Sequence, residues 1–383
     1  FLIIRDFGMV DNNLTVGMML WNEAATLNKV LWSLRDIADK YVLGVDRKSS
    51  DGTQEIAQEW SDDYFEYDFN DDFSEIRNKV LERCKTRWFF QVDGHEFLND
   101  QSIKYIKELK DRDDIDIAFI NLTLWGEDEP QLLFLSPRIF RTDRNIIYER
   151  KIHNTLTSKL GKDHYDGLKK IDDPGIVLDH IQPQSRHNMR SNQRKDISIK
   201  GLTKQAMAKN DSYDWYNLGV MKTYSNDEEG AVLAFENALK ICERDDARYQ
   251  IKLFLAGLYK WKGERDRAKD ILISAYLNDP RRCEHLVEIG ALFEEENNLD
   301  KALWFYNLAA SYTVPTCQMS LYLPYYSYWV WERMMKIYGK KGDLVNALKA
   351  GEVLRTFKFF RHQEQLSFYL EKYKKILYEK END

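Results

Sequence analysis

The sequence predicts an α/β domain followed by an all-α domain built from helical repeats. In the first half, short apolar runs that are typical of strands alternate with amphipathic helices, which is the pattern of a parallel sheet. In the second half, glycine and proline become rare and similar blocks recur roughly every 37 residues. A chain of 383 residues exceeds one ordinary core, so we expect two domains, at residues 1–205 and 206–383.

The composition narrows the class of protein. Hydrophobic residues make up 43% of the chain and charged residues 31%, which indicates a folded protein rather than a disordered one. The net charge of −7 gives no overall positive field to attract nucleic acid or anionic lipid. No apolar run approaches the ~20 residues of a membrane span. The widely spaced cysteines fit neither a zinc site nor a disulfide framework, so we expect reduced thiols and a cytoplasmic location.

Strands and helices alternate through the first domain. Leu14–Leu20 is expected to be the first strand, followed by a helix over Ala24–Ala38 and a second strand at Tyr41–Val45. A polar turn then leads into the helix Gln54–Trp60. The remaining elements are expected at Phe73–Cys84 (helix) and at Trp88–Val92, Ile115–Leu124 and Gln131–Phe140 (strands).

The strand Trp88–Val92 runs directly into the cluster Asp93-Gly94-His95-Glu96. In open α/β sheets, ligands collect beyond the carboxyl ends of the strands. Gly94 places no side chain between two ligand types, so Asp93 and His95 can face one ion. A carboxylate oxygen beside an imidazole suits Mn²⁺ better than Mg²⁺. The alternative is a polar turn that only closes the strand.

Four blocks together resemble a family 2 glycosyltransferase of the GT-A fold, which has a Rossmann-like nucleotide-sugar-binding domain. They are LTVGMMLWNEAATLNKVLWSL, VDRKSSDGTQEIA, DFSEIRNKVLE and WFFQVDGHEF, and they occur in the order of the family pattern across Leu14–Leu98. The resemblance implies an enzyme that uses a nucleotide diphosphate-sugar, with UDP as the expected carrier.

The resemblance also implies roles for individual residues. Asp46 and Asp51 would accept hydrogen bonds from the base or the ribose, and Asn22 and Glu23 would belong to the same pocket. Arg77 offers a fork for phosphate oxygens. Asp93 would serve both the nucleotide-sugar and the metal. Two alternatives stay open: Asp51 as a helix N-cap only, and Arg77 as a member of a surface ion pair.

The metal motif departs from the family pattern because His95 occupies the place of the usual second Asp. An Asp-x-His motif resembles that of the polypeptide GalNAc-transferases, in which a downstream His completes the metal site. His153 is the first candidate for that ligand and His180 is the second, although either residue can be purely structural. His153 follows a stretch that begins at Arg138 and resembles the family pattern, except that Asn154 replaces the usual Glu.

Two further features of the first domain concern the acceptor. An inverting enzyme needs a carboxylate to deprotonate the acceptor, and Glu127 and Asp128 in the acidic loop after Ile115–Leu124 are the candidates. A solvated acidic turn is the simpler alternative. From Arg138 to Lys204, basic residues outnumber acidic ones by 15 to 8. This local excess would suit a diphosphate leaving group or a polyanionic acceptor.

The second half has the spacing of tetratricopeptide repeats. Small and large apolar residues recur so that paired helices can approach closely, and stacked pairs form a surface that can hold a partner. An aromatic insertion, Leu321–Tyr328, interrupts the array, and Glu352–Lys380 is expected to be a closing helix. Stabilising a homo-oligomer is the alternative role. The four copies carry Trp215, Leu218, Gly219, Ala231, Phe235 and Ala238; Leu255, Tyr259, Ala268, Ala275 and Pro280; Ile289, Gly290, Phe293, Ala302, Tyr306 and Ala309; and Trp331, Tyr338 and Ala347.

These features lead to one main hypothesis and two alternatives. The main hypothesis is a metal-dependent glycosyltransferase of the hexosyltransferase type, which moves a sugar from a nucleotide diphosphate-sugar to a peptide, protein or glycan. The first alternative is a phage-type enzyme that acts on modified DNA bases. The second is a degenerate sugar-nucleotide-binding domain on a repeat scaffold. The sequence leaves open the sugar, the acceptor and the stereochemistry.

Overall fold

The computed structural model describes residues 13–181, 199–358, 360 and 362–382. The chain divides into two compact units. One unit lies within residues 1–125 and 134–202, and the other comprises residues 126–133 and 203–383. The sequence did not indicate that the short segment Gly126–Leu133 belongs with the helical half of the chain.

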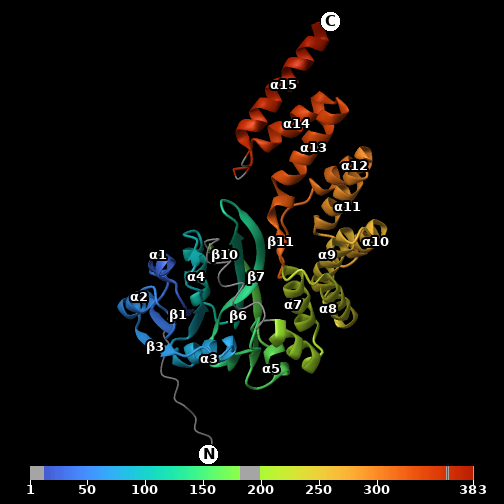
Figure 1. Cartoon of the computed structure of the whole chain (residues 1–383). Coiled ribbons are helices and arrows are strands. Elements are labelled where there is room, and N and C mark those ends of the chain that lie inside the picture. Colours follow the sequence, from blue (N-terminus) through green and yellow to red (C-terminus); the bar gives the residue numbers. More distant parts are fainter. Residues whose placement is uncertain (1–12, 182–198, 359, 361, 383) are drawn as a thin grey trace, which may run out of the picture. The chain divides into compact units, whose positions relative to one another are not determined.

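The first unit is built on a mixed sheet whose strands follow the order β3-β2-β1-β4-β7-β6-β10-β5 (Figure 1). β1, β2, β3 and β4 form a parallel block, and β7 pairs antiparallel with β4. The strands are β1 Leu14–Leu20, β2 Lys40–Asp46, β3 Asp63–Tyr67, β4 Trp88–Gln91, β5 Glu96–Leu98, β6 Ile117–Trp125, β7 Pro130–Arg141 and β10 Lys170–His180; β8 Ile146–Glu149 and β9 Thr155–Ser158 form a separate hairpin.

Strand alternation distributes the apolar side chains of the sheet between two cores. Trp88 and Phe90 of β4 join the larger core with the buried residues of α1 (Ala24–Leu34) and α4 (Ser102–Lys110). Phe89 points to the opposite face, where Val80 of α3 (Phe73–Arg83) packs. Gly17 of β1 is required on that face, because a Cβ there would lie 2.3 Å from the ring of Phe89. This packing fixes the register of β1 against β4.

The helices of the first unit largely match the sequence prediction. α1 begins at the expected residue but ends four residues earlier, at Leu34, and α4 and α5 were not predicted. Asp72 caps α3 by accepting a hydrogen bond from the Glu75 N–H at 3.1 Å. The helices are α1 Ala24–Leu34, α2 Thr53–Trp60, α3 Phe73–Arg83, α4 Ser102–Lys110 and α5 Lys162–Asp166, with a 3₁₀ turn η1 at Thr142–Arg144.

The second unit consists mainly of antiparallel helix pairs, as the repeat pattern predicted. Residues 199–209 are helical and lead into the array. The pairs are α7 Ser212–Tyr224 with α8 Glu228–Ile241, α9 Asp245–Trp261 with α10 Arg265–Tyr276, α11 Glu284–Glu295 with α12 Leu299–Ala309, and α13 Tyr328–Lys341 with α14 Leu344–Leu354; α15 Gln363–Asn382 follows.

Small residues on the first helix of a pair receive large side chains from the second helix. A Cβ at Gly219 of α7 would lie 2.7 Å from the ring of Phe235 on α8, and one at Gly290 of α11 would lie 2.6 Å from the ring of Tyr306 on α12. These contacts explain why Gly and an aromatic residue recur at fixed spacing. The turn inside each pair has a left-handed residue, in order Asn226, Gly263, Asn297 and Gly342.

The aromatic insertion is part of the second unit's packed interior. It forms β11 Leu321–Tyr322, which pairs with residues Leu132 and Leu133 at the start of β7, and the 3₁₀ turn η2 Leu323–Tyr326. The Tyr326 hydroxyl donates to Glu284 at 2.6 Å. Glu284 forms a buried ion pair with Arg282 at 2.6 Å. Tyr325 and Tyr326 therefore pack against the core of the second unit.

The described part of the chain contains no membrane-spanning helix and no disulfide bond. None of its helices has the length and apolar character needed to cross a membrane. All of its cysteines are free thiols, as expected from their spacing: Cys84, Cys242, Cys283 and Cys317.

Candidate functional site

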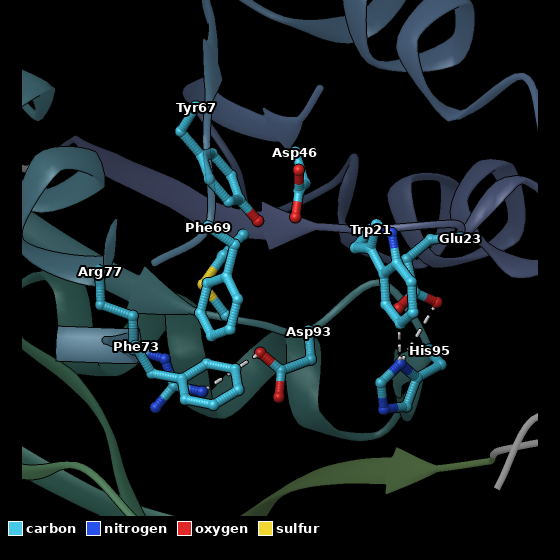
Figure 2. Close-up of a pocket in the computed structure, with 10 residues that line it drawn as sticks. Trp21, Glu23, Asp46, Tyr67, Phe69, Phe73, Arg77, Asp93 and His95 are labelled. Atoms are coloured by element: carbon cyan, nitrogen blue, oxygen red, sulfur yellow. Dashed lines mark hydrogen bonds and ion pairs between the residues drawn. The ribbon is translucent and has the colours of Figure 1, made fainter. Parts of the chain in front are cut away.

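A pocket lies at the carboxyl edge of the parallel block, where β1, β2 and β4 end (Figure 2). Because parallel strands present their carboxyl ends on one edge, residues far apart in the sequence meet there. The pocket is lined by Met19, Trp21, Glu23, Asp46, Tyr67, Phe69, Phe73, Arg77, Asp93 and His95. Five of these ten residues were predicted from the sequence to bind the nucleotide-sugar or the metal.

One end of the pocket combines a buried carboxylate with aromatic rings. Asp46, the last residue of β2, is 3% exposed, and its Oδ1 accepts a hydrogen bond from the Lys48 N–H at 3.0 Å. The rings of Phe69 and Phe73 lie 4.7 Å apart, centroid to centroid. A flat, hydrogen-bonding ligand such as a nucleobase matches this combination of an acceptor and aromatic faces.

Asp93 and Arg77 face each other across the pocket. The Arg77 Nη2 lies 3.5 Å from Asp93 Oδ1, and both side chains are about four-fifths buried. The Arg77 Nε is buried and makes no hydrogen bond with the described residues. Arg77 is therefore a pocket residue rather than a member of a surface ion pair.

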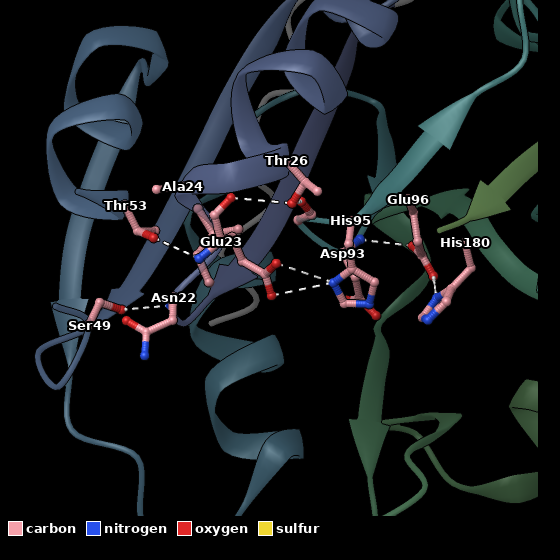
Figure 3. A network of polar contacts seen from close by, with 12 residues as sticks. Asn22, Glu23, Ala24, Thr26, Ser49, Thr53, Asp93, His95, Glu96 and His180 are labelled. Atoms are coloured by element: carbon pink, nitrogen blue, oxygen red, sulfur yellow. Dashed lines mark hydrogen bonds and ion pairs between the residues drawn. The ribbon is translucent and has the colours of Figure 1, made fainter. Parts of the chain in front are cut away.

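His95 is held by a carboxylate from β1's end. Its Nδ1 lies 3.3 Å from Oε1 and 3.4 Å from Oε2 of Glu23, which is 3% exposed (Figure 3). Burial alone would lower the pKa of His95, but the hydrogen bond to Glu23 and the negative charges of Glu23, Asp93 and Glu96 together outweigh that effect and raise the pKa above its usual value. Because a carboxylate only accepts, the neutral ring carries its proton on Nδ1, which leaves Nε2 as an electron-pair donor.

Behind the pocket lies a buried ion pair that the sequence did not reveal. Glu96 is fully buried, and its Oε1 lies 2.8 Å from Nη2 of Arg138. Burial alone would raise the pKa of Glu96, but Arg138 and His180 lower it well below its usual range. His180, at the end of β10, lies 3.5 Å from Glu96 and packs edge-on against His95, with ring centroids 4.4 Å apart.

Asn22 and Asp51 lie near the pocket and are not among its lining residues. The Asn22 Oδ1 accepts from the Ser50 N–H at 2.8 Å, so it braces the loop after β2. Asp51 accepts from the Thr53 N–H at 3.2 Å and from the Ala24 N–H at 3.1 Å, which are at the starts of α2 and α1. Asp51 therefore braces the starts of both helices, although the N-cap residue of α2 is Gly52. The nucleotide-binding roles of Asn22 and Asp51 stay predictions.

The remaining predicted residues do not line the pocket. His153 is exposed, with a left-handed backbone, in the turn between β8 and β9. Glu127 and Asp128 are exposed in the loop between β6 and β7, within the segment that groups with the second unit. Their roles as metal ligand and catalytic base are untested predictions. Residues 182–198 of the basic stretch between Arg138 and Lys204 lie outside the described residues.

Two of the pocket residues, Asp93 and His95, have side chains that can ligate a divalent ion. In the described chain, no three His, Cys, Asp or Glu side chains converge closely enough to hold a metal by themselves. Asp93 and His95 nevertheless fit the task as a pair, since both face the pocket and His95 has the carboxylate partner that often orients a metal-binding imidazole. The other ligands would have to come from substrate oxygens and water.

Sequence reasoning missed the aromatic lining and the support behind Asp93. Trp21, Phe69 and Phe73 are loop or helix-start residues whose approach to the pocket depends on the fold. One signal was available: Trp21 precedes the predicted Asn22 and Glu23 directly. Gln91 and Arg138 meet through the antiparallel pairing of β4 with β7, and Glu96 is placed by the pairing of β5 with β10; a single sequence specifies neither pairing.

The first part of the chain resembles known glycosyltransferases in sequence. Residues 15–162 match the family model of glycosyl transferase family 2. The SPbeta prophage-derived glycosyltransferase SunS of Bacillus subtilis (strain 168) is 22% identical over 189 residues, which is 49% of this chain and 44% of SunS. Glycosyltransferase SunS of Bacillus phage SPbeta matches equally. The chain thus spans less than half the length of these curated relatives.

Solved structures give more distant likenesses. Staphylococcus aureus TarS is 14% identical, with a TM-score of 0.37 over 67% of this chain and 54% of TarS. A tetratricopeptide repeat protein from Parabacteroides merdae is 13% identical, with a TM-score of 0.37 over 50% of this chain and 70% of that protein. At these scores the likenesses carry no argument about function.

Proposed function

Since residues 15–162 form a glycosyltransferase family 2 domain, we propose that the protein transfers a sugar from a nucleotide diphosphate-sugar, with UDP as the carrier. One observation carries the proposal most: a buried acceptor, aromatic rings, an arginine, a carboxylate and an imidazole line a single pocket at the sheet's carboxyl edge. These groups match the base, diphosphate and metal parts of such a donor.

In this proposal, each part of the pocket has its own task. Asp46 accepts hydrogen bonds from the nucleoside, and Trp21 and Phe69 cover the base. Arg77 binds the diphosphate. The bond between the sugar's anomeric carbon and the β-phosphate oxygen breaks, a bond to an acceptor atom forms, and a carboxylate takes the acceptor's proton. Glu127 and Asp128 are the candidates for that base.

We propose that Asp93 and His95 hold a divalent ion, with Mn²⁺ preferred to Mg²⁺. When bound, the ion neutralises negative charge on the leaving diphosphate. Glu23 keeps His95 in the tautomer that can donate to a metal, and His180 supports His95 through its edge-on ring contact. His180 or His153 as a further ligand stays part of the proposal.

For the acceptor, we propose a peptide, protein or glycan that binds the helical unit. A groove between α7 and α9 contains Leu253, Phe254 and the 69%-exposed Trp261. Gly257 lies in the middle of α9, where Gly weakens a helix, yet a Cβ there would meet no atom within 4 Å. Since internal packing does not require this glycine, close approach of an acceptor segment would explain it.

The proposal is tested by release of nucleotide from a panel of UDP-sugars and GDP-sugars, with Mn²⁺, Mg²⁺ or a chelator. We expect slow hydrolysis of one UDP-sugar that requires Mn²⁺ or Mg²⁺ and is lost in Asp93→Asn. Asp36→Asn is the matched control, because Asp36 is half exposed and pairs only at the surface with Arg35. Full turnover by Asp93→Asn would contradict the site assignment.

Two outcomes would favour the alternative functions. Nucleotide binding without turnover, even with acceptors supplied, would indicate a degenerate domain on a repeat scaffold. Binding to DNA that weakens steeply with salt would favour an enzyme acting on modified bases. Absence of DNA binding at low salt would remove that second alternative.

A further inference from the structure

Gln91 joins the candidate metal-binding carboxylate to the buried ion pair behind it. It is the last residue of β4 and is 5% exposed. Its Nε2 donates to Asp93 Oδ1 at 2.7 Å, and its Oε1 accepts from Arg138 Nη1. Because a guanidinium only donates and a carboxylate only accepts, the Gln91 amide can satisfy both partners in one orientation only.

The same ion pair also holds the backbone of Asp93. Glu96 Oε2 accepts from the Asp93 N–H at 2.8 Å (Figure 3), while Arg138 holds Glu96 through both carboxylate oxygens, at 2.8 and 3.2 Å. Asp93 is therefore tied to one rigid, desolvated group at two points. Glu96 fixes its backbone, and Gln91 fixes its side chain.

This arrangement makes the two oxygens of Asp93 different. Oδ1 receives the hydrogen bond from Gln91 and lies 3.5 Å from Arg77, whereas Oδ2 accepts no hydrogen bond from the described residues. Figure 2 shows the second oxygen turned away from the contact with Arg77. Without Gln91, the carboxylate could rotate and meet Arg77 through both oxygens, which is a favoured geometry for such pairs.

We propose that Gln91 is a positioning residue for the transfer reaction. It holds Asp93 Oδ1 on the protein side, so that Oδ2 alone faces the pocket and Asp93 binds the metal–diphosphate group through a single oxygen. The inference rests on the proposed function, and it assigns to Gln91 a role that acts through Asp93 rather than through contact with the substrate.

The test is the affinity of Gln91→Met for UDP in the presence of Mn²⁺, measured by calorimetry. Methionine keeps the length and bulk of the side chain but removes both polar groups. We expect affinity to fall about 10–100-fold, the usual effect of losing a partner that orients a metal ligand. Without UDP and Mn²⁺, the melting temperature should stay close to that of the unaltered protein.

The matched control is Gln205→Met. Gln205 also donates its Nε2 to an aspartate, Asp214, at 2.6 Å, but in the second unit. Its loss should leave UDP affinity unchanged. If Gln91→Met does not fold, Gln91→Asn keeps the amide on a side chain one methylene shorter, and the same loss of affinity is expected.

Three results would have different meanings. Equal UDP affinity in Gln91→Met and Gln205→Met, both folded, would overturn the role of Gln91 and leave the proposed function standing. Absence of UDP binding by the unaltered protein would overturn the proposed function itself, and the role of Gln91 with it. A selective loss in Gln91→Met would support both.

Discussion

Among the described residues, each unit contains a buried arginine–glutamate ion pair, and the two pairs have different surroundings. In the α/β unit, Arg138 and Glu96 contact Gln91, the Asp93 backbone and His180 beside an open pocket. In the helical unit, Arg282 and Glu284 contact the Ser320 carbonyl and the Tyr326 hydroxyl of the aromatic insertion. The first pair supports residues that line the pocket at the sheet's carboxyl edge, whereas the second fastens an insertion to a helical core.

Burial alone therefore does not identify a functional ion pair. Both pairs are almost inaccessible, and either would be costly to break. The two pairs differ in the surface that their next contacts reach: Gln91 and the Asp93 N–H lead from the first pair to residues of the pocket at the sheet edge. The second pair also has a polar link, because Arg282 donates to Gln250 at 3.0 Å and Gln250 lines the groove between α7 and α9.

The largest expected effect concerns the residue that the first pair supports. Asp93→Asn should lower donor turnover by about 10³-fold, since it removes charge stabilisation where the leaving group becomes negative. Nucleotide release from the preferred UDP-sugar measures the loss. The thermal stability of Asp93→Asn should stay near that of the unaltered protein. A loss of turnover of less than about 10-fold would contradict a link between the first ion pair and catalysis.

The next expected effect is a loss of unfolding free energy, which should be equal when either ion pair loses its arginine. Arg138→Met and Arg282→Met each leave a buried carboxylate without its partner, which typically costs about 3–5 kcal/mol of unfolding free energy. Chemical denaturation measures this cost. Among variants that remain folded, only Arg138→Met should weaken binding of UDP with Mn²⁺, and equal binding losses in both would remove the distinction drawn here.

A smaller expected effect is on how the unfolding free energy depends on pH, because the histidines beside the two ion pairs have pKa values shifted in opposite directions. Burial lowers the pKa of His285, beside Glu284, to about 4. Below pH ~6.5 the unfolded chain takes up a proton that the folded state refuses, so unfolding free energy should fall by up to about 3 kcal/mol as the pH decreases to ~4. The difference between the unaltered protein and His285→Gln in denaturation at several pH values measures this.

His95 should behave in the opposite way, since its pKa is raised by Glu23. Protonation of His95 stabilises the folded state below pH ~6.5, and that contribution disappears as the pH rises through the folded-state pKa. Between pH ~6.5 and ~4, acid should therefore destabilise His285→Gln less than it destabilises the unaltered protein or a His95 variant. A loss that is unchanged in His285→Gln would contradict the assignment.

The smallest expected effect is that of Gly257→Ala, which tests whether the groove between α7 and α9, beside the second pair, binds the acceptor. Gly257→Ala should raise unfolding free energy by about 0.5–1 kcal/mol, because Ala favours a helix and a Cβ at this position meets no atom. If the groove holds the acceptor, the more stable variant should use acceptor less well. Unchanged acceptor use would leave the second pair purely structural.

The control for Gly257→Ala is the same substitution at another helical glycine. Gly219→Ala should destabilise the protein, since its Cβ would lie 2.7 Å from the ring of Phe235. Thermal denaturation of the two variants should therefore shift in opposite directions.

The sequence predicted the elements that carry strong local patterns. The apolar run Leu14–Leu20 is a strand at the expected residues, and the repeat spacing predicted the helix pairs of the second unit. β3, with the sequence DYFEY, was missed because its side chains are only partly buried and carry two charges. β8 and β9 were missed because short hairpin strands have too few residues to show a period.

The sequence predicted those site residues that are polar and lie at the end of a buried strand. Asp46, Asp93 and His95 follow buried strands, so their meeting at one edge follows from parallel pairing. The support behind them was not predictable, because Gln91 and Arg138 are 47 residues apart and meet only through the register of β4 against β7. The grouping of Gly126–Leu133 with the helical unit also depends on long-range pairing with β11.

The most direct test of the central claim is a crystal structure with UDP and Mn²⁺, recorded with anomalous scattering from manganese. We expect a manganese peak beside Asp93 Oδ2 and His95 Nε2, with the uracil near Asp46 and the aromatic side chains of the pocket. A nucleotide bound elsewhere, or manganese bound without either of these ligands, would contradict the proposed site.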